Sequence, residues 1–264
     1  MGQRDAGRYP YFDADFIALA HRGGACAQAP AALENSLRSF DAAASLGYRH
    51  LETDVHATSD GVLIAFHDDR LDRVTDATGV IADLPWSVVS RGLIGGREPI
   101  PRFSDLLEAL PQARFNLDIK ADAATDLLAA TLAHHSAGAR VCVGSFSTRR
   151  IGRFRRLTRG EIATSASPAE VAVFAFGPGL RRRWPLVCQA FQVPEREPRT
   201  RVRVVTPGLI AAAHRRGAAV HVWTVNDRAA MESLIDLGVD GLVTDEIALL
   251  KQVLQERGMW EGNR

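Results

Sequence analysis

The chain has 264 residues, of which 46% are hydrophobic, and this is enough to build one large buried core. Its 32 lysine and arginine residues are balanced by 31 aspartate and glutamate residues, so the formal net charge is +1. This balance excludes the strongly basic composition of proteins that bind nucleic acid through overall charge, and no apolar run approaches the length of a transmembrane helix.

Strand-like apolar runs alternate with helical patterns along the chain. Eight strands are expected at residues 16–20, 49–55, 114–120, 140–144, 161–165, 186–191, 219–225 and 241–243. A helix is expected after each strand, at residues 34–46, 104–110, 123–135, 148–157, 168–176, 207–216, 228–237 and 246–257. This alternation predicts a single-domain α/β fold, the (β/α)₈ TIM barrel, which typically needs about 250 residues. An open doubly wound sheet shows the same alternation, but its usual Gly-x-Gly-x-x-Gly pattern does not follow the first strand.

The expected barrel spans residues 16–258, between an N-terminal extension at 1–15 and a C-terminal tail at 259–264. Residues 62–67 are expected to form a hairpin with the second strand, because an Asp-Gly turn precedes them. Residues 68–101 show no clear periodicity and are expected to form a mostly irregular surface stretch.

The first expected strand ends in His21 and Arg22, followed by two glycines. Histidine titrates near neutral pH, which suits acid–base catalysis. The planar guanidinium of arginine matches the geometry of a phosphate. The alternative is an ordinary turn that carries a solvated arginine.

Glu52 and Asp54 lie two positions apart at the end of the second strand, so their side chains should project from the same face. Two carboxylates held this close need a cation, a shared proton or solvent. Mg²⁺ and Ca²⁺ take oxygen ligands of this kind, and His67 closes the hairpin beside them. The alternative is a solvated strand face.

Two later strands also carry polar or aromatic side chains near their ends. Asn116, Asp118 and Lys120 share one face of the third strand, which is typical of a strand that lines a polar site. A simple ion pair between Asp118 and Lys120 is the alternative. Trp223 belongs either to the core or to the apolar wall of a pocket. All these residues fall at strand ends, where the sites of TIM barrels lie.

In order and spacing these motifs resemble the glycerophosphodiester phosphodiesterase family, from about Phe16 to about Leu250. The motifs that carry the resemblance are His21-Arg22-Gly23, Glu34-Asn35-Ser36, Glu52-Thr53-Asp54-Val55, Asp60-Gly61 with His67-Asp68, Asn116-Leu117-Asp118-Ile119-Lys120, Trp223-Thr224-Val225-Asn226, and Gly238-Val239-Asp240-Gly241 with Thr244-Asp245. Each motif alone is weak evidence, but the ordered set is specific.

The resemblance implies a phosphoric diester hydrolase that converts glycerophosphodiesters into glycerol 3-phosphate and an alcohol in a metal-dependent reaction. It implies one divalent metal ion, Mg²⁺ or Ca²⁺, held by Glu52, Asp54 and Asp118. It also implies that His21 and His67 divide the acid and base roles, without saying which histidine takes which role.

The same resemblance assigns roles to five further residues. Arg22 and Lys120 would bind the phosphate oxygens as charge develops, and Trp223 would contribute to substrate binding. Glu34 and Asn35 would lie behind the reacting groups and orient the histidines or the metal ligands.

One departure from the family pattern leaves a second function open. The family usually carries Glu at the position of Asp118, whose side chain is one methylene shorter but is still an oxygen ligand. The related sphingomyelinase D enzymes look similar and use Asp there. The alternative is therefore a phospholipase D-like enzyme for lysolipids or sphingolipids, in which attack by a substrate hydroxyl would give a cyclic phosphate. A catalytically silent barrel is disfavoured, because the histidines and the acidic residues are all present.

The three cysteines, Cys26, Cys142 and Cys188, are widely separated and form neither a Cys-x-x-Cys pair nor a zinc pattern. The first residues lack the apolar segment of a signal peptide. We therefore expect a cytoplasmic protein that acts on a small-molecule substrate, with no nucleic-acid partner and no integral membrane segment.

Overall fold

The computed structural model describes residues 6–25, 30–177, 179 and 183–262. Eight parallel strands form its central sheet, in the spatial order β8-β7-β6-β2-β1-β11-β10-β9. Their bounds are β1 (Ile17–His21), β2 (His50–Ala57), β6 (Arg114–Ile119), β7 (Val141–Gly144), β8 (Ala163–Thr164), β9 (Ala190–Pro194), β10 (Ala219–Trp223) and β11 (Gly241–Thr244). A parallel bridge between Ser165 and Ala190 joins the two edges of this sheet, so the strands close into the predicted TIM barrel.

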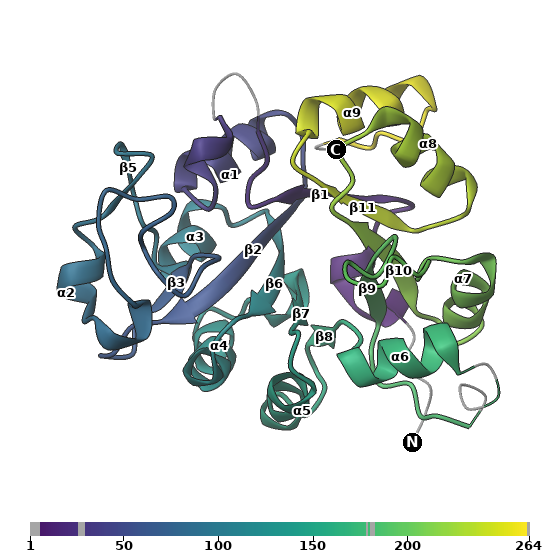
Figure 1. Ribbon diagram of the computed structural model, residues 1–264, viewed down its shortest axis with the longest axis horizontal. Coiled ribbons are helices and arrows are strands. Elements are labelled where there is room, and N and C mark those ends of the chain that lie inside the picture. The colour runs from purple at the N-terminus through teal and green to yellow at the C-terminus, as the bar shows by residue number, and fades with distance from the viewer. Residues whose placement is uncertain (1–5, 26–29, 178, 180–182, 263–264) are drawn as a thin grey trace.

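Helices surround the strands (Figure 1), and their inner faces pack on the outside of the barrel in the main hydrophobic core. They are α1 (Leu37–Ser45), α3 (Phe103–Ala109), α4 (Asp122–His134), α5 (Thr148–Leu157), α6 (Pro168–Phe176), α7 (Pro207–His214), α8 (Arg228–Asp236) and α9 (Ile247–Glu256). None of the helices in the described part of the chain is long and apolar enough to cross a membrane.

The stretch after the second barrel strand has more structure than its sequence pattern indicated. The short strand β3 (Leu63–Ala65) pairs antiparallel with β2, as the hairpin prediction required. Residues 68–101 then contain η4 (Ile81–Asp83), α2 (Trp86–Val89), β4 (Leu93–Ile94) and β5 (Glu98–Pro99). These elements share a second apolar cluster built on Ile64, Phe66, Leu71, Ile81, Val89, Ile94 and Ile100. The irregular prediction was wrong in this respect, because each element is too short to show a periodicity.

The helix predicted at residues 34–46 begins later than expected. The short 3₁₀ helix η3 (Ala31–Leu33) is followed by a turn in which Asn35 takes a φ of 60°. Helix α1 begins at Leu37 because the hydroxyl of Ser36 accepts a hydrogen bond from the Ser39 amide and caps it. Glu34 and Asn35 therefore lie in a turn.

The sixth barrel strand lies further along the chain than the predicted range of 186–191. Strand β9 runs from Ala190 to Pro194, since Gln192 and Pro194 belong to it although neither looks like a residue of a buried strand. The Gln192 amide donates to Asn116 Oδ1 across the barrel at 2.6 Å, and Pro194 pairs in register with Trp223. The polar partner on another strand is what permits Gln192 there.

The described part of the N-terminal extension fills the barrel interior. It contains η1 (Ala6–Arg8) and η2 (Pro10–Phe12), and the Tyr11 side chain is completely buried. Tyr11 packs with apolar side chains of β1, β7, β8 and β11, which lie on different sides of the barrel. Its carbonyl is 2.8 Å from His50 Nε2, and its ring meets the His50 ring edge-to-face. Residues 1–5 of the extension lie outside the described residues.

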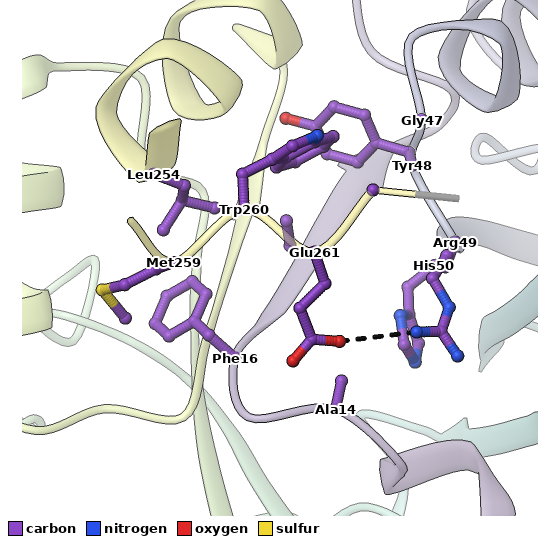
Figure 2. A pocket seen from close by; sticks show the side chains of 12 residues that line it. Ala14, Phe16, Gly47, Tyr48, Arg49, His50, Leu254, Met259, Trp260 and Glu261 are labelled. Carbon is purple, nitrogen blue, oxygen red and sulfur yellow. Dashed lines mark hydrogen bonds and ion pairs between the residues drawn. The ribbon is translucent and has the colours of Figure 1, made fainter. Parts of the chain in front are cut away.

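The described part of the C-terminal tail packs against the start of β2. The Trp260 ring lies edge-on to Tyr48 at 5.1 Å, and the Glu261 carboxylate is 3.4 Å from Arg49 Nη1 (Figure 2). The cavity beside them measures about 30 Å³, which is room for a single water molecule. Residues 263 and 264 lie outside the described residues.

The position of Tyr11 predicts that the N-terminal segment contributes to global stability. We expect Tyr11→Ala to lower the free energy of unfolding by about 3–5 kcal/mol, since it removes a large buried aromatic side chain and leaves a cavity. Urea denaturation measures this loss. Arg8→Ala, an exposed change in the same segment, should alter stability by less than about 0.5 kcal/mol. Equal stability of the Tyr11 variant and the native chain would contradict the assignment.

Candidate active site

Three carboxylates meet at the carboxyl ends of two neighbouring strands. Glu52 and Asp54 lie on β2, and Asp118 lies on β6 directly opposite Asp54 in the parallel register. On the other side of β2, His21 at the end of β1 is in register with Glu52. Strand pairing therefore sets these four side chains in adjacent positions at one end of the barrel, the end at which the active sites of TIM barrels lie.

The carboxylates are shielded from water, and this changes their acidity. The side chains of Glu52 and Asp54 are only 9% and 3% exposed. Burial, and next the charge of Asp54, raise the pKa of Glu52 to about 7. Burial also raises the pKa of Asp118. The cluster thus favours a cation that would offset its negative charge.

Lys120 supplies one such cation. Its Nζ atom is 2.9 Å from Asp54 Oδ1 and 2.8 Å from Asp118 Oδ2. Burial alone would lower the pKa of Lys120, but the charges of Asp118 and Asp54 outweigh it, and the pKa is raised. Lys120 therefore stays charged within the site. The ion pair of Asp118 and Lys120, given above as the alternative to a polar site, is present, and it extends to Asp54.

Arg22 is bound to the cluster through its backbone and its side chain. Its amide donates to Glu52 Oε2 at 3.1 Å, and Arg22 adopts a left-handed φ of 52°. Its guanidinium lies 3.2 Å from Glu34 and 3.5 Å from Asp54. A non-glycine residue held in this region is strained, and such strain is concentrated at functional sites.

His21 is held by a carboxylate from the last strand. Its Nδ1 atom is 2.6 Å from Asp245 Oδ1, just beyond β11. Asn226 fixes Asp245 in turn, since its side chain donates to Asp245 Oδ2 at 2.8 Å and accepts from the Asp245 amide at 2.9 Å. Burial lowers the pKa of His21, but Glu52 and Asp245 together raise it above its ordinary value. Because a carboxylate only accepts, the Nδ1 proton points to Asp245 and Nε2 faces Glu52 at 3.9 Å.

His67 also binds an aspartate through Nδ1, but this aspartate is held by an arginine. Its Nδ1 atom is 2.6 Å from Asp68 Oδ1. Arg73 then binds Asp68 through Nε at 2.5 Å and Glu34 through Nη2 at 2.6 Å. The hydrogen bond from Arg73, followed by the bond to His67, lowers the pKa of Asp68 to about 2. A continuous chain of ion pairs thus connects His67 to Arg22 through Arg73 and Glu34.

Glu34 and Asn35 lie behind the site as backing residues, but neither bonds to a histidine. Glu34 binds the guanidinium groups of Arg22 and Arg73. The Asn35 side chain accepts from the Thr53 hydroxyl at 2.7 Å, and its amide donates to the Arg22 carbonyl at 2.9 Å. Both residues therefore fix the turn that presents Arg22.

Trp223 lies at the other side of the site and is half-buried. Part of it packs against the cluster inside the barrel. Its ring also meets Phe146 edge-to-face at 5.6 Å, and Lys120 Nζ lies 5.4 Å from the centre of the Phe146 ring. Trp223 and Phe146 together make an apolar wall next to the charged groups.

Two of the three residues expected to bind metal have a carboxylate oxygen that accepts no hydrogen bond, although Arg22 Nε lies 3.5 Å from the one on Asp54. Asp54 Oδ2 and Asp118 Oδ1 are buried and have no hydrogen-bond partner. Buried carboxylate oxygens without partners are costly, and a hard divalent cation would satisfy them. Across the part of the chain that is described, however, no three acidic, histidine or cysteine side chains are already gathered around one point as a finished cage. The donor set fits such an ion, and Lys120 Nζ now lies between two of the three carboxylates.

Sequence reasoning missed five residues that take part in this arrangement. Asp245, Asp68 and Asn226 belong to the family's motifs, but the pattern assigns them no role, although Asp245 and Asp68 bind the histidines and Asn226 fixes Asp245. Nothing in the sequence pattern singles out Arg73 or Phe146. An acidic residue directly after the last barrel strand was the available signal for Asp245, because β11 neighbours β1 in a closed barrel.

Comparison with known proteins agrees with this geometry. The model of the glycerophosphoryl diester phosphodiesterase family matches residues 21–249. A probable glycerophosphodiester phosphodiesterase of Mycobacterium tuberculosis is 38% identical over 251 residues, covering 93% of both chains. A lysophospholipase D of Rattus norvegicus is 23% identical over 273 residues, covering 89% of this chain and 85% of the relative.

Solved structures show the same fold. A phosphodiesterase of Oleispira antarctica, solved in complex with the product sn-glycerol-3-phosphate, superposes with a TM-score of 0.76 at 22% identity and covers 96% of this chain and 100% of its own. The family model spans most of the sequence and includes every residue of the site described above. The chain therefore belongs to the glycerophosphoryl diester phosphodiesterase family and is an enzyme of that class.

Proposed function

We propose that the enzyme hydrolyses glycerophosphodiesters to glycerol 3-phosphate and an alcohol, with the help of one divalent metal ion, Mg²⁺ or Ca²⁺. The main support is the pairing of His21 and His67 with aspartates through Nδ1, together with the buried carboxylate cluster that begins beside His21 at Glu52. The M. tuberculosis relative carries the same activity in its name, and the O. antarctica structure contains the corresponding product.

Glu52, Asp54 and Asp118 would hold the metal ion, through the carboxylate oxygens that are buried in the site. When bound, the ion supplies positive charge to a phosphate oxygen and lowers the pKa of an attached water or hydroxyl. Arg22 and Lys120 would bind the remaining phosphate oxygens. Their side chains are already held at the edge of the cluster by Asp54, so little ordering is needed when the substrate binds.

His21 and His67 would move protons at the attacking and leaving oxygens. Each ring has its Nδ1 atom fixed by a carboxylate, so its Nε2 atom is available to the substrate. Asp245 and Asp68 set the ring orientation and stabilise the imidazolium form as a proton arrives. Trp223 would contribute apolar contact to the substrate, and Glu34 and Asn35 would support Arg22.

A phospholipase D-like reaction on lysolipids or sphingolipids is the second candidate, with a cyclic phosphate as its product if a substrate hydroxyl attacks. Two observations favour it: Asp118 replaces the usual Glu, and a relative is named a lysophospholipase D. The same residues serve both reactions, since each cleaves a phosphodiester. Only the attacking oxygen and the size of the substrate differ.

We further propose that the enzyme acts in the cytoplasm on small, water-soluble phosphodiesters. The free cysteines Cys142 and Cys188 are buried and reduced, which is usual in that compartment. Cys26 lies outside the described residues. The near-neutral net charge gives no general attraction to nucleic acid.

Metal removal tests the proposed reaction directly. We expect a chelator to abolish the cleavage of glycerophosphodiesters, and Mg²⁺ or Ca²⁺ to restore it, because the three carboxylates otherwise repel a phosphate. Phosphorus NMR of the products should show glycerol 3-phosphate. Full activity in excess chelator would contradict a role for the metal ion. A cyclic phosphate among the products would contradict hydrolysis to glycerol 3-phosphate and support the phospholipase D-like reaction.

Replacement of either histidine tests the acid–base assignment. We expect His21→Ala and His67→Ala each to lower kcat by about a hundredfold or more, the usual scale for loss of a general acid or base. Circular dichroism should show a folded protein, since both side chains lie at the strand ends and not in the apolar core. His134→Ala, an exposed change at the end of α4, serves as the matched control. Near-normal turnover of the His67 variant would refute the scheme.

Asp118 can be tested by two changes of opposite effect. Asp118→Asn should strongly weaken Mg²⁺ or Ca²⁺ binding in calorimetric titration, because it removes a charged ligand. Asp118→Glu should retain binding, because it keeps the carboxylate and only lengthens the side chain. If Asp118 served Lys120 alone, both changes would be mild, as for pairs worth about 1 kcal/mol or less. An Asn variant that binds metal like the native enzyme would remove Asp118 from the ligand set.

A further inference from the structure

One arginine outside the barrel binds two carboxylates that belong to different parts of the active site. Arg73 donates to Asp68 through Nε at 2.5 Å and through Nη2 at 3.1 Å. It donates to Glu34 through Nη2 at 2.6 Å and through Nη1 at 3.1 Å. These bonds engage all three nitrogen atoms of the guanidinium, whose planar fork is suited to holding two carboxylates in a fixed arrangement.

Each of the two carboxylates holds a group that the proposed function uses. Asp68 Oδ1 lies 2.6 Å from His67 Nδ1, and Glu34 Oε1 lies 3.2 Å from Arg22 Nη1. Among the described residues, Arg73 is the only arginine or lysine that forms an ion pair with Asp68. The supports of His67 and Arg22 therefore meet at Arg73.

The charge of Arg73 also decides the state of Asp68. The hydrogen bond from Arg73 is the main cause that lowers the pKa of Asp68 to about 2. An ionised Asp68 only accepts hydrogen bonds, so His67 keeps its Nδ1 proton toward Asp68 and leaves Nε2 for the substrate. The two carboxylates offset the charge of Arg73 itself, which makes it a poor partner for a substrate phosphate. Any effect of Arg73 on the reaction must then pass through Asp68 and Glu34.

The turn that carries Arg73 is anchored on both sides. Leu71 is fully buried in the second apolar cluster, and its carbonyl accepts from the Thr75 hydroxyl at 2.8 Å and from the Thr75 amide at 3.2 Å. Val74 packs against the same cluster, and its carbonyl accepts from the Gly95 amide at 2.8 Å. The guanidinium is therefore presented from a fixed point of the backbone.

Stability of the fold gives a poor account of this arrangement. The Arg73 side chain is 48% exposed, and ion pairs of exposed side chains contribute little to the free energy of unfolding. The segment at residues 68–101 has an apolar cluster to hold it in place. The ion pairs of Arg73 instead connect two groups on which the reaction depends.

We propose that Arg73 is a positioning residue for the active site. Through Asp68 it fixes the ring of His67, and through Glu34 it fixes the guanidinium of Arg22. It thereby holds the proton-transfer group and the phosphate-binding group in one arrangement. The inference rests on the proposed function, which gives His67 and Arg22 these roles.

The test removes the guanidinium in three backgrounds, with the glycerophosphodiester and the Mg²⁺ or Ca²⁺ of the metal test. We expect Arg73→Ala to lower kcat/KM of the native enzyme by about 10- to 100-fold, the usual range for loss of a group that orients reacting side chains. In a His67→Ala or a Glu34→Ala background the same change should cost clearly less, because one of the two groups through which Arg73 acts is already lost.

The loss that remains should also differ between the two backgrounds. In His67→Ala it should appear mainly in KM, since only the phosphate contact of Arg22 is left to disturb. In Glu34→Ala it should appear mainly in kcat, since only His67 is left to disturb. A loss of unchanged size in either background would overturn the inference, because Arg73 would then not act through that partner.

Arg70→Ala is the matched control, because Arg70 is an exposed arginine of the same segment that pairs with Asp72 at 3.1 Å. It should leave kcat and KM unchanged. Thermal unfolding should show Arg73→Ala to be nearly as stable as the native enzyme. If this variant does not fold, Arg73→Lys takes its place, since it keeps the charge but cannot bind both carboxylates through a fork.

The remaining outcomes separate the inference from the function on which it rests. Native kcat and KM in the Arg73 variant, or a loss of activity that only follows a loss of stability, would overturn the inference and leave the proposed function intact. Failure of the native enzyme to cleave any glycerophosphodiester, with Mg²⁺ or Ca²⁺ present, would reject the proposed function and the inference with it.

Discussion

The whole site depends on keeping like charges together inside the protein at the ends of parallel strands. The register of β1, β2 and β6 places His21 beside Glu52, and Asp54 beside Asp118. Carboxylates this close and this buried would separate in a flexible chain, because their repulsion is strong where water is excluded. Hydrogen bonds between the strand backbones hold the carboxylates in place in spite of their mutual repulsion.

The surrounding groups reduce that cost without removing it. Lys120 binds two of the carboxylates, and Arg22 approaches the cluster from the turn after β1. Even so, Asp54 Oδ2 and Asp118 Oδ1 accept no hydrogen bond, and the pKa of Glu52 is raised. Buried carboxylate oxygens without hydrogen bonds and a raised carboxyl pKa are typical of a site that is completed by its ligands. In a purely structural ion pair, every buried polar atom would have a partner.

The two histidines receive equivalent partners from unrelated parts of the chain. Asp245 follows the last barrel strand and reaches His21 because closure of the barrel makes β11 a neighbour of β1. Asp68 follows the hairpin and is held by Arg73 from the segment outside the barrel. The segment at 68–101, with its own apolar cluster, thus does more than cover a surface: it carries the arginine that connects His67 to Glu34.

The sequence alone determined the alternation of strands and helices, and hence the barrel, because apolar periodicity and chain length are local properties. It also grouped Glu52 with Asp54, since the alternation within a strand shows which side chains share a face, whereas Asp118 on another strand was added only by the resemblance to the family. It could not place β9 correctly, because the polar Gln192 finds its hydrogen-bond partner, Asn116, on another strand. Nor could it give Asp245, Arg73 and Phe146 their roles, or show that Tyr11 fills the barrel. Each of these roles depends on contacts between residues far apart in the chain, and only the closed tertiary structure decides which side chains make such contacts.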